Sequence, residues 1–143
     1  MSILAIDNLG VIAKTLSPRY SDVQEARTFA RGLELYILDD KPLIVTEMVD
    51  VHSAMPFQKF VDTIRKKDVR SYTPIIVYTY NINKDNGKEM VARLTGLGVD
   101  AIVQQSPHIG AIESLVRWIN QLKSEPMEFY GNPQVWLKPK RVI

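Results

Sequence analysis

The sequence contains no cysteine, two histidines and no long apolar run. Without cysteine the chain forms no disulfide, has no catalytic thiolate and binds no zinc or iron–sulfur cluster through cysteine. The histidines, His52 and His108, are too few for a typical histidine-rich metal site. No stretch reaches the roughly 18 apolar residues of a membrane-spanning helix, and no signal-peptide pattern marks the N-terminus. These absences predict a cytoplasmic protein without a membrane span.

The net charge is also small, at +2 over 143 residues. That excess does not by itself predict a nucleic-acid partner, and the short basic end over residues 138–141 adds only weak evidence for one. Hydrophobic residues make up 45% and charged residues 24% of the chain, which is typical of a globular domain. The length fits one such domain with a real core.

Short apolar segments alternate with amphipathic segments over most of the chain. The apolar segments predict strands over residues 2–7, 43–46, 75–79 and 101–103. Helical spacing of apolar residues predicts helices over residues 57–64, 88–97 and 109–119. Alternating strands and helices indicate βα units, and therefore a mainly parallel sheet covered by helices.

Residues 8–41 carry two competing patterns. Ser21 to Gln24 has capping-box spacing, and apolar residues follow at helical intervals as far as Ile37, which predicts one helix. Residues 33–38 also alternate with period two, which is typical of a strand that begins after a helix ends at Gly32. Both alternatives stay open.

The pattern changes from Ser124 onward. Prolines and Gly131 interrupt any helix there, while Phe129, Tyr130 and Trp136 supply large apolar groups. A disordered tail is usually poor in aromatic residues. We therefore expect a domain over residues 1–123 and a C-terminal extension over residues 124–143 that docks on the domain or on a partner.

Two segments of the second half carry a family resemblance. Residues 73–79 read Thr-Pro-Ile-Ile-Val-Tyr-Thr, and residues 98–107 read Gly-Val-Asp-Ala-Ile-Val-Gln-Gln-Ser-Pro. With the helix between them, they resemble the fourth strand, fourth helix and fifth strand of bacterial response-regulator receiver domains. The resemblance extends over residues 42–121. It implies a flavodoxin-like, three-layer α/β sandwich with its site at the carboxyl ends of the strands.

The resemblance also assigns positions in that site. It places Asp7 and Asn8 at the acid pair that binds Mg²⁺ in a working receiver, and Thr79 and Tyr80 at the switch positions. Gln105 stands where the family has a lysine. The phospho-acceptor aspartate corresponds to one of two further acids, Glu47 or Asp50.

These positions depart from the family pattern. One acid of the pair is an asparagine, which leaves at most weak Mg²⁺ binding. The neutral amide of Gln105 cannot supply the positive charge that a phosphoryl group needs. At the acceptor position the preceding apolar run favours Glu47, whereas the spacing to Thr79 favours Asp50. A glutamate there carries its carboxylate one methylene further out and resembles a permanently charged state.

The sequence therefore predicts an atypical, stand-alone receiver-like signalling module that works without ordinary aspartyl phosphorylation. We expect it to bind another signalling protein, or a second copy of itself, through residues 88–121. The same resemblance predicts no catalytic residue, no enzymatic activity and no cofactor beyond weakly bound Mg²⁺.

Two alternatives come from other classes of protein. In the first, Asp7, Glu47 and His108 converge in a small flavodoxin-like enzyme or nucleotide-binding domain. In the second, the C-terminal aromatics of an assembly subunit pack on a neighbouring chain. Plain structural roles compete with all of these: Thr79 suits a strand by propensity alone, and Asp7 could simply cap the following turn.

Overall fold

The described strands form one sheet in the computed structural model, which covers residues 2–38, 42–48, 55–67, 73–82, 85–105, 109–124 and 135–137 in describable detail. The strands are β1 (Ile3–Ile6), β2 (Val23–Ala26), β3 (Leu43–Thr46), β4 (Ile75–Thr79), β5 (Ala101–Gln104) and β6 (Val135–Leu137). Their order is β2-β1-β3-β4-β5-β6. The pairs from β2 to β5 are parallel, and β6 pairs antiparallel with β5.

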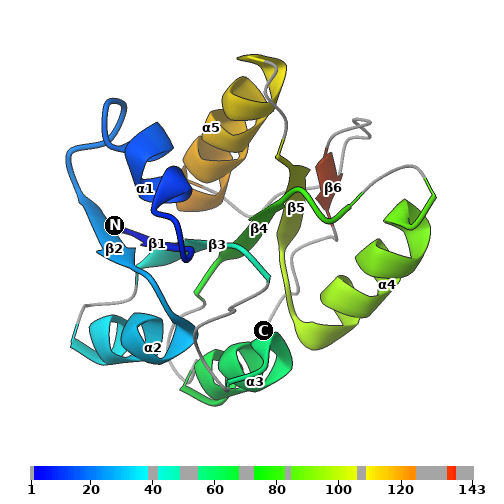
Figure 1. Ribbon diagram of the computed structural model, residues 1–143, viewed down its shortest axis with the longest axis horizontal. Coiled ribbons are helices and arrows are strands. Elements are labelled where there is room, and N and C mark those ends of the chain that lie inside the picture. Colours follow the sequence, from blue (N-terminus) through cyan, green and yellow to red (C-terminus); the bar gives the residue numbers. More distant parts are fainter. Residues whose placement is uncertain are drawn as a thin grey trace.

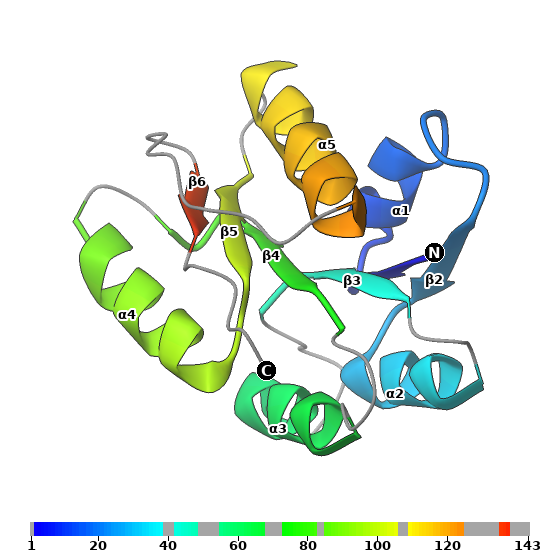
Figure 2. The ribbon, with the colours of Figure 1, turned by 180° about the vertical axis from the view of Figure 1, so that it is seen from behind.

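Helices cover both faces of this sheet, as Figures 1 and 2 show. The helices are α1 (Val11–Leu16), α2 (Phe29–Leu38), α3 (Phe57–Lys67), α4 (Gly87–Leu97) and α5 (Ile109–Ser124). Helices α1 and α5 lie on one face, and α2, α3 and α4 lie on the other. The predicted three-layer α/β sandwich with a mainly parallel sheet is confirmed.

Each face of the sheet has its own apolar core. Ile12 and Leu16 of α1 pack with Trp118 of α5 against alternate residues of the strands. On the other face, Phe29 of α2 stacks on Phe60 of α3, with ring centroids 5.1 Å apart. Strands β1, β3 and β4 are buried along their whole length, as expected of parallel strands covered on both sides.

The prediction of one helix starting near Ser21 was wrong. Val23–Ala26 form β2, which pairs with β1, and the helix begins only at Phe29. The capping-box spacing was overridden because pairing with β1 satisfies the backbone of this segment, a tertiary effect that local propensity does not contain.

The alternative strand over residues 33–38 was wrong as well, since α2 runs through Gly32 to Leu38. Gly32 does not end the helix. A Cβ at this position would lie 2.5 Å from Cδ1 of Ile6. The glycine therefore allows α2 to approach β1 closely.

A largely buried ion pair lies at the amino edge of the sheet. Arg65 of α3 contacts Asp100 Oδ2 through Nη2 at 3.1 Å, and donates from Nη1 to the carbonyl of Thr73 at 2.7 Å. Its Nε and Nη2 donate to the carbonyl of Gly98 at 3.1 and 2.6 Å. Asp100 Oδ2 also accepts the N–H of Ile75 at 2.8 Å. This network holds α3, β4 and β5 in register where the strands begin.

Part of the C-terminal extension continues the sheet. Residues 135–137 pair with β5 in the order Leu137 to Ala101, Trp136 to Ile102 and Val135 to Val103. The domain boundary at residue 123 remains a prediction. None of the helices in the described ranges is long and apolar enough to cross a membrane.

Candidate functional site

The carboxyl ends of the parallel strands meet at one edge of the sheet. In the pairing register, Ile6 of β1 lies beside Thr46 of β3, and Thr79 of β4 lies beside Gln104 of β5. The residues that follow β1 and β3 are Asp7 and Glu47, and the N–H of Glu47 donates to the carbonyl of Ile6 at 2.9 Å. Side chains from separate parts of the sequence are thereby brought to the edge where open α/β sheets place their sites.

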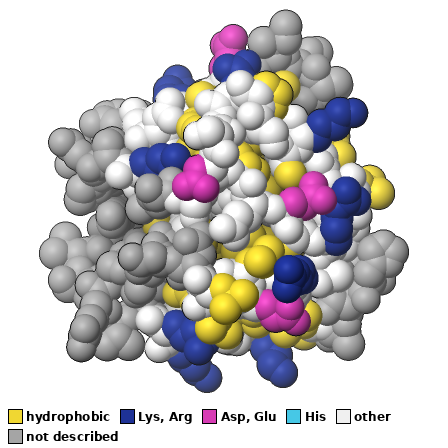
Figure 3. All heavy atoms as spheres, turned by 90° about the vertical axis from the view of Figure 1, so that its left-hand side faces the viewer, with side chains coloured by type: hydrophobic (Ala, Val, Ile, Leu, Met, Phe, Trp, Pro, Cys, Tyr) yellow, Lys and Arg dark blue, Asp and Glu magenta, His cyan; other side chains and the backbone are white. Residues whose placement is uncertain are grey.

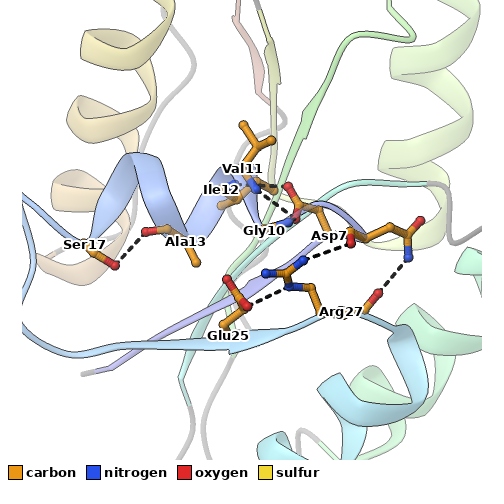
Figure 4. Close-up of polar contacts among 9 residues, drawn as sticks. Asp7, Gly10, Val11, Ile12, Ala13, Ser17, Glu25 and Arg27 are labelled. Atoms are coloured by element: carbon orange, nitrogen blue, oxygen red, sulfur yellow. Dashed lines mark hydrogen bonds and ion pairs between the residues drawn. The ribbon is translucent and has the colours of Figure 1, made fainter.

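Asp7 caps the start of α1. One carboxylate oxygen accepts the N–H groups of Gly10 and Val11, the latter at 3.1 Å, and the other accepts the N–H of Ile12 at 3.0 Å (Figure 4). These are N–H groups of the first turn, which have no acceptor within the helix. Both oxygens of Asp7 are therefore used within the fold.

Asn8 bonds to Arg27, the residue that follows β2. Its Nδ2 donates to the carbonyl of Arg27 at 2.7 Å, and Nη1 of Arg27 donates back to the carbonyl of Asn8 at 3.3 Å. The same guanidinium pairs with Glu25 at 2.7 Å (Figure 4). Gly10 has φ +73° and a Cβ there would meet this guanidinium at 2.6 Å, so the turn after Asn8 favours glycine. The second acid-pair position thus braces the loops after β1 and β2.

Glu47 is the first residue after β3 and is partly buried. Its Oε1 accepts the N–H of Met48 at 2.8 Å, and its carboxyl group also hydrogen-bonds the side chain of Thr79. Burial raises the pKa of Glu47 above its ordinary value, and the nearby charge of Asp7 adds to the rise, while the bonds from Thr79 and Met48 act against it. Glu47 is therefore easier to protonate than an exposed glutamate.

Thr79 joins Glu47 to β5. It is fully buried at the end of β4, and its carbonyl accepts the N–H of Gln105 at 2.7 Å. Its hydroxyl oxygen accepts the N–H of Asn81 at 3.0 Å. Gln105 itself is only 8% exposed, whereas Tyr80 is 61% exposed. The two switch positions thus differ sharply, one inside the site and one on the surface.

The structure places most of the predicted site residues at one edge. Asp7, Glu47 and Thr79 come together through their side chains, and Gln105 joins them through its backbone. Asp50 lies outside the described residues, as do His52 and His108. The roles that the resemblance assigns to these positions stay predictions.

Sequence reasoning missed Arg27 as a residue of the site. Its contact with Asn8 depends on β2, and the segment that forms β2 was predicted as helix. Correct recognition of a strand ending at Ala26 would have marked the next residue, Arg27, for inspection at the carboxyl edge. No pattern in the sequence marks Asn81 as a partner of Thr79.

The oxygen ligands that Mg²⁺ would need at this edge are partly engaged within the fold. Mg²⁺ needs several free oxygen ligands in octahedral array. Asp7 uses both oxygens on backbone N–H groups, and the amide of Asn8 is engaged with Arg27. Over the described ranges, no group of three histidine, aspartate or glutamate side chains is placed to hold a metal ion.

Known structures share this fold. The chemotaxis response regulator CheY4 of Vibrio cholerae aligns with a TM-score of 0.65 and 16% sequence identity, over 82% of this chain and 97% of that one. The signal receiver domain of a DNA-binding response regulator of Colwellia psychrerythraea aligns with a TM-score of 0.62 and 18% identity, over 85% and 99%. The N-terminal domain of an uncharacterized Wolinella succinogenes protein aligns with a TM-score of 0.63 and 16% identity, over 86% and 95%.

These likenesses show that the chain has the fold of receiver domains. No protein-family model matches the sequence, and the search of curated proteins found no significant match. The predicted resemblance is therefore confirmed for the fold. Function rests on the chemistry of the strand ends.

Proposed function

We propose that this chain is an atypical receiver-like signalling module that acts by binding another protein and is not switched by ordinary aspartyl phosphorylation. The observation that carries the proposal is the hydrogen bond between Glu47 and Thr79. In the family that the chain resembles, the hydroxyl of the switch threonine interacts with the phosphorylated aspartate. Here a carboxyl group, held one methylene further out, engages the threonine without a phosphoryl group.

Two neighbouring features support the absence of phosphotransfer. The acid at the end of β1 caps α1, so its oxygens are turned to backbone N–H groups. At the end of β5 the buried residue is Gln105, whose neutral amide lacks the charge of an ammonium group. Charge stabilisation by metal and cation is the main protein contribution to phosphoryl transfer, and both components are weakened.

Intact-protein mass after incubation with Mg²⁺ and acetyl phosphate tests this part of the proposal. We expect no added phosphoryl group on the natural chain. A matched variant carries Asn8→Asp, Glu47→Asp and Gln105→Lys, which restores the family pattern, and serves as the comparison. A hydroxylamine-labile adduct on the natural chain, mapped to Asp50, would overturn the proposal and make Asp50 the acceptor.

We assign partner binding to residues 88–121, where α4 and α5 supply the exposed surface because β5 is buried and paired with β6 at its outer edge. Arg93 of α4 and Arg117 of α5 are exposed there. The partner is another signalling protein or a second copy of the chain. Figure 3 shows, on the face made by α1, β2 and α2, basic side chains interspersed with acidic ones, so this face has no single-sign field of the kind that attracts nucleic acid.

Charge reversal tests the binding surface. With the natural protein as bait, cross-linking in a cell extract should capture a partner that Arg93→Glu and Arg117→Glu lose. Arg31→Glu on α2 is the matched control, because Arg31 is exposed on the side of the sheet formed by β1 and β2, away from α4 and α5, and should leave capture unchanged. Loss of capture by Arg31→Glu, with none by the other two variants, would move the interface to the α2 side.

The competing functions have less support. An enzyme would need His108 beside Asp7 and Glu47, and no observation on the described residues favours it. An assembly subunit would bury its C-terminal aromatics on a neighbour, whereas residues 135–137 pair here with β5 of the same chain. If the protein self-associates, its mass in solution rises with concentration. Removal of residues 125–143, which leaves α5 complete, should therefore not abolish that rise.

A further inference from the structure

A continuous chain of hydrogen bonds runs from Glu47 to the first turn of α4. The carboxyl group of Glu47 bonds the Thr79 side chain, whose oxygen accepts the N–H of Asn81 at 3.0 Å. The carbonyl of Asn81 accepts Nδ2 of Asn86 at 3.0 Å. The carbonyl of Asn86 then accepts the N–H of Met90 at 2.9 Å, which is a bond of the first turn of α4.

The polarity of this chain depends on the charge of Glu47. A threonine hydroxyl has one proton to donate and can accept through its lone pairs. Because the Thr79 oxygen accepts from Asn81, its own proton points to an ionised Glu47. When Glu47 is protonated, it can donate to the Thr79 oxygen instead, so that the threonine proton must turn elsewhere. The oxygen that holds the Asn81 N–H then loses a charge-assisted partner.

The surroundings of Glu47 suit it to this exchange. The carboxylate of Asp7, after β1, acts on it as a like charge, and among the described residues it accepts the Met48 N–H and the Thr79 hydroxyl. The buried residue after β5 is Gln105, which is neutral. Within the described ranges no lysine or arginine pairs with Glu47. Burial without a cation raises its pKa, which brings protonation closer to neutral pH.

Asn86 occupies the far end of the chain. It is the N-cap residue of α4, but its side chain makes no capping bond to the helix and reaches back to Asn81. The amide therefore closes the connection between β4 and α4 across residues 82–85. Tyr80, which is 61% exposed, lies between Thr79 and Asn81, so a shift of Asn81 moves an aromatic group on the surface.

We propose that proton uptake from solvent by Glu47 is the input of this module, and that Thr79, Asn81 and Asn86 relay it to Tyr80 and to the start of α4. Asn86 is a positioning residue, since it acts on α4 through Asn81. This inference rests on the proposed function, because it names the signal that alters the binding surface over residues 88–121. It also assigns the role of the missing phosphoryl group to a proton.

NMR titration of the labelled protein over acidic to neutral pH tests the relay. The side-chain carboxyl carbon of Glu47 reports its own protonation, and the backbone amides of Tyr80, Asn81 and Met90 report the loop and α4. We expect these amides to shift with the same midpoint as the Glu47 carboxyl. The amide of Ile119, which is buried inside α5, should show no shift at that midpoint and serves as internal control.

Four variants separate the relay from its surroundings. Glu47→Gln should abolish the shared midpoint at all three amides. Asn86→Ala, which removes no helix cap bond, should leave the titration of Glu47 and of Asn81 in place and abolish the response of Met90. Thr79→Val, of nearly equal volume, should leave Glu47 titrating while the Asn81 response is lost. Asp85 precedes Asn86 in the sequence and carries a second carboxyl group. Asp85→Asn removes that group and should keep the response of all three amides.

The outcomes are distinct from those of the function tests. A Met90 response that survives Asn86→Ala, or an absence of any shared midpoint in the natural chain, would overturn the relay. Thr79→Val changes a buried side chain and could prevent folding. Asn86→Ala changes a side chain nearer the surface and tests the relay independently of that variant. Phosphorylation by acetyl phosphate would overturn the proposed function while the titration could still succeed, so the two proposals fail separately.

Discussion

The two edges of the central sheet hold buried charge in different ways. At the amino edge, Asp100 is matched by Arg65, and this guanidinium also saturates two backbone carbonyls. At the carboxyl edge, the carboxyl groups of Asp7 and Glu47 have backbone N–H groups and a hydroxyl as their partners in the described part of the chain.

This difference separates a structural edge from one that can change state. A buried ion pair with several hydrogen bonds is costly to break, because removal of either partner leaves the other charge uncompensated. A carboxyl group held by neutral donors can instead take up a proton at moderate cost. The fold thus fixes where the strands begin and leaves a titratable group where they end.

The largest effect should come from removal of the cation at the amino edge. Arg65→Ala removes the charge that Arg65 places beside the buried Asp100 carboxylate, together with its bonds to two carbonyls, and we expect a loss of about 3 kcal/mol in the free energy of unfolding. Urea denaturation measures it. Arg31→Ala is the matched control, because the Arg31–Glu34 pair has side chains 55% and 63% exposed and should contribute less than about 1 kcal/mol. Equal losses in the two variants would remove the distinction between the edges.

Removal of the cap at the carboxyl edge should cost less. Asp7→Ala leaves the N–H groups of Gly10, Val11 and Ile12 without their acceptor, at about 1 to 2 kcal/mol for a lost cap. Asp7→Asn keeps an acceptor oxygen and should lose less. Asp62→Ala, on the exposed face of α3, is the control and should stay within about 0.5 kcal/mol of the natural chain. A negligible loss for Asp7→Ala would contradict the capping role and leave the Asp7 carboxylate available as a metal ligand.

The second half of the fold was predictable because its signals are local and agree with one another. The apolar runs over β3 and β4 are continuous, and the apolar spacing in α3 and α5 is that of a helix packed on a sheet. Residues 8–41 were not predictable in this way. Strand β2 is an edge strand of four residues with only Ala26 buried, so its pattern is too short to outweigh a chance capping-box match.

The candidate site was predictable in position and not in contacts. Strand ends point to Asp7, Glu47 and Thr79 by the general rule for open α/β sheets. Asp7 caps α1 and Asn8 bonds to Arg27 because of the path that the chain takes through Gly10 and β2. Such side-chain to backbone bonds are set by loop geometry, which a single sequence does not reveal.

Protonation of Glu47 gives a pH-dependent effect on stability. Burial raises the pKa of Glu47 in the folded state above its value in the unfolded chain. Stability is therefore lost as the pH rises from the unfolded-state pKa of Glu47 through its folded-state pKa. Glu47→Gln removes this cost. We expect the variant to unfold at higher temperature than the natural chain at pH 8, with a difference that shrinks in acid, below the ordinary glutamate pKa of about 4.3.

Thermal unfolding at a series of pH values measures this difference. Glu34→Gln serves as control, because Glu34 is exposed on α2 and its substitution should give no comparable pH dependence. The Arg65–Asp100 pair should contribute equally to the free energy of unfolding of the natural chain and of Glu47→Gln. A pH-independent difference for Glu47→Gln would mean that packing, and not charge, sets the state of the carboxyl edge.

The smallest effect should come from Mg²⁺, and it distinguishes a capped edge from a metal-binding one. A ligand that binds only the folded state adds less than about 0.4 kcal/mol while its concentration stays below its Kd. Because Asp7 and Asn8 are engaged with backbone groups, we expect millimolar Mg²⁺ to move the unfolding temperature no more than NaCl of equal ionic strength. Asn8→Asp with Glu47→Asp supplies two further short carboxylates and should increase the Mg²⁺ response. A clear response of the natural chain, lost in Asp7→Ala, would show that the cap opens for a metal ion and that the two edges differ less than their contacts suggest.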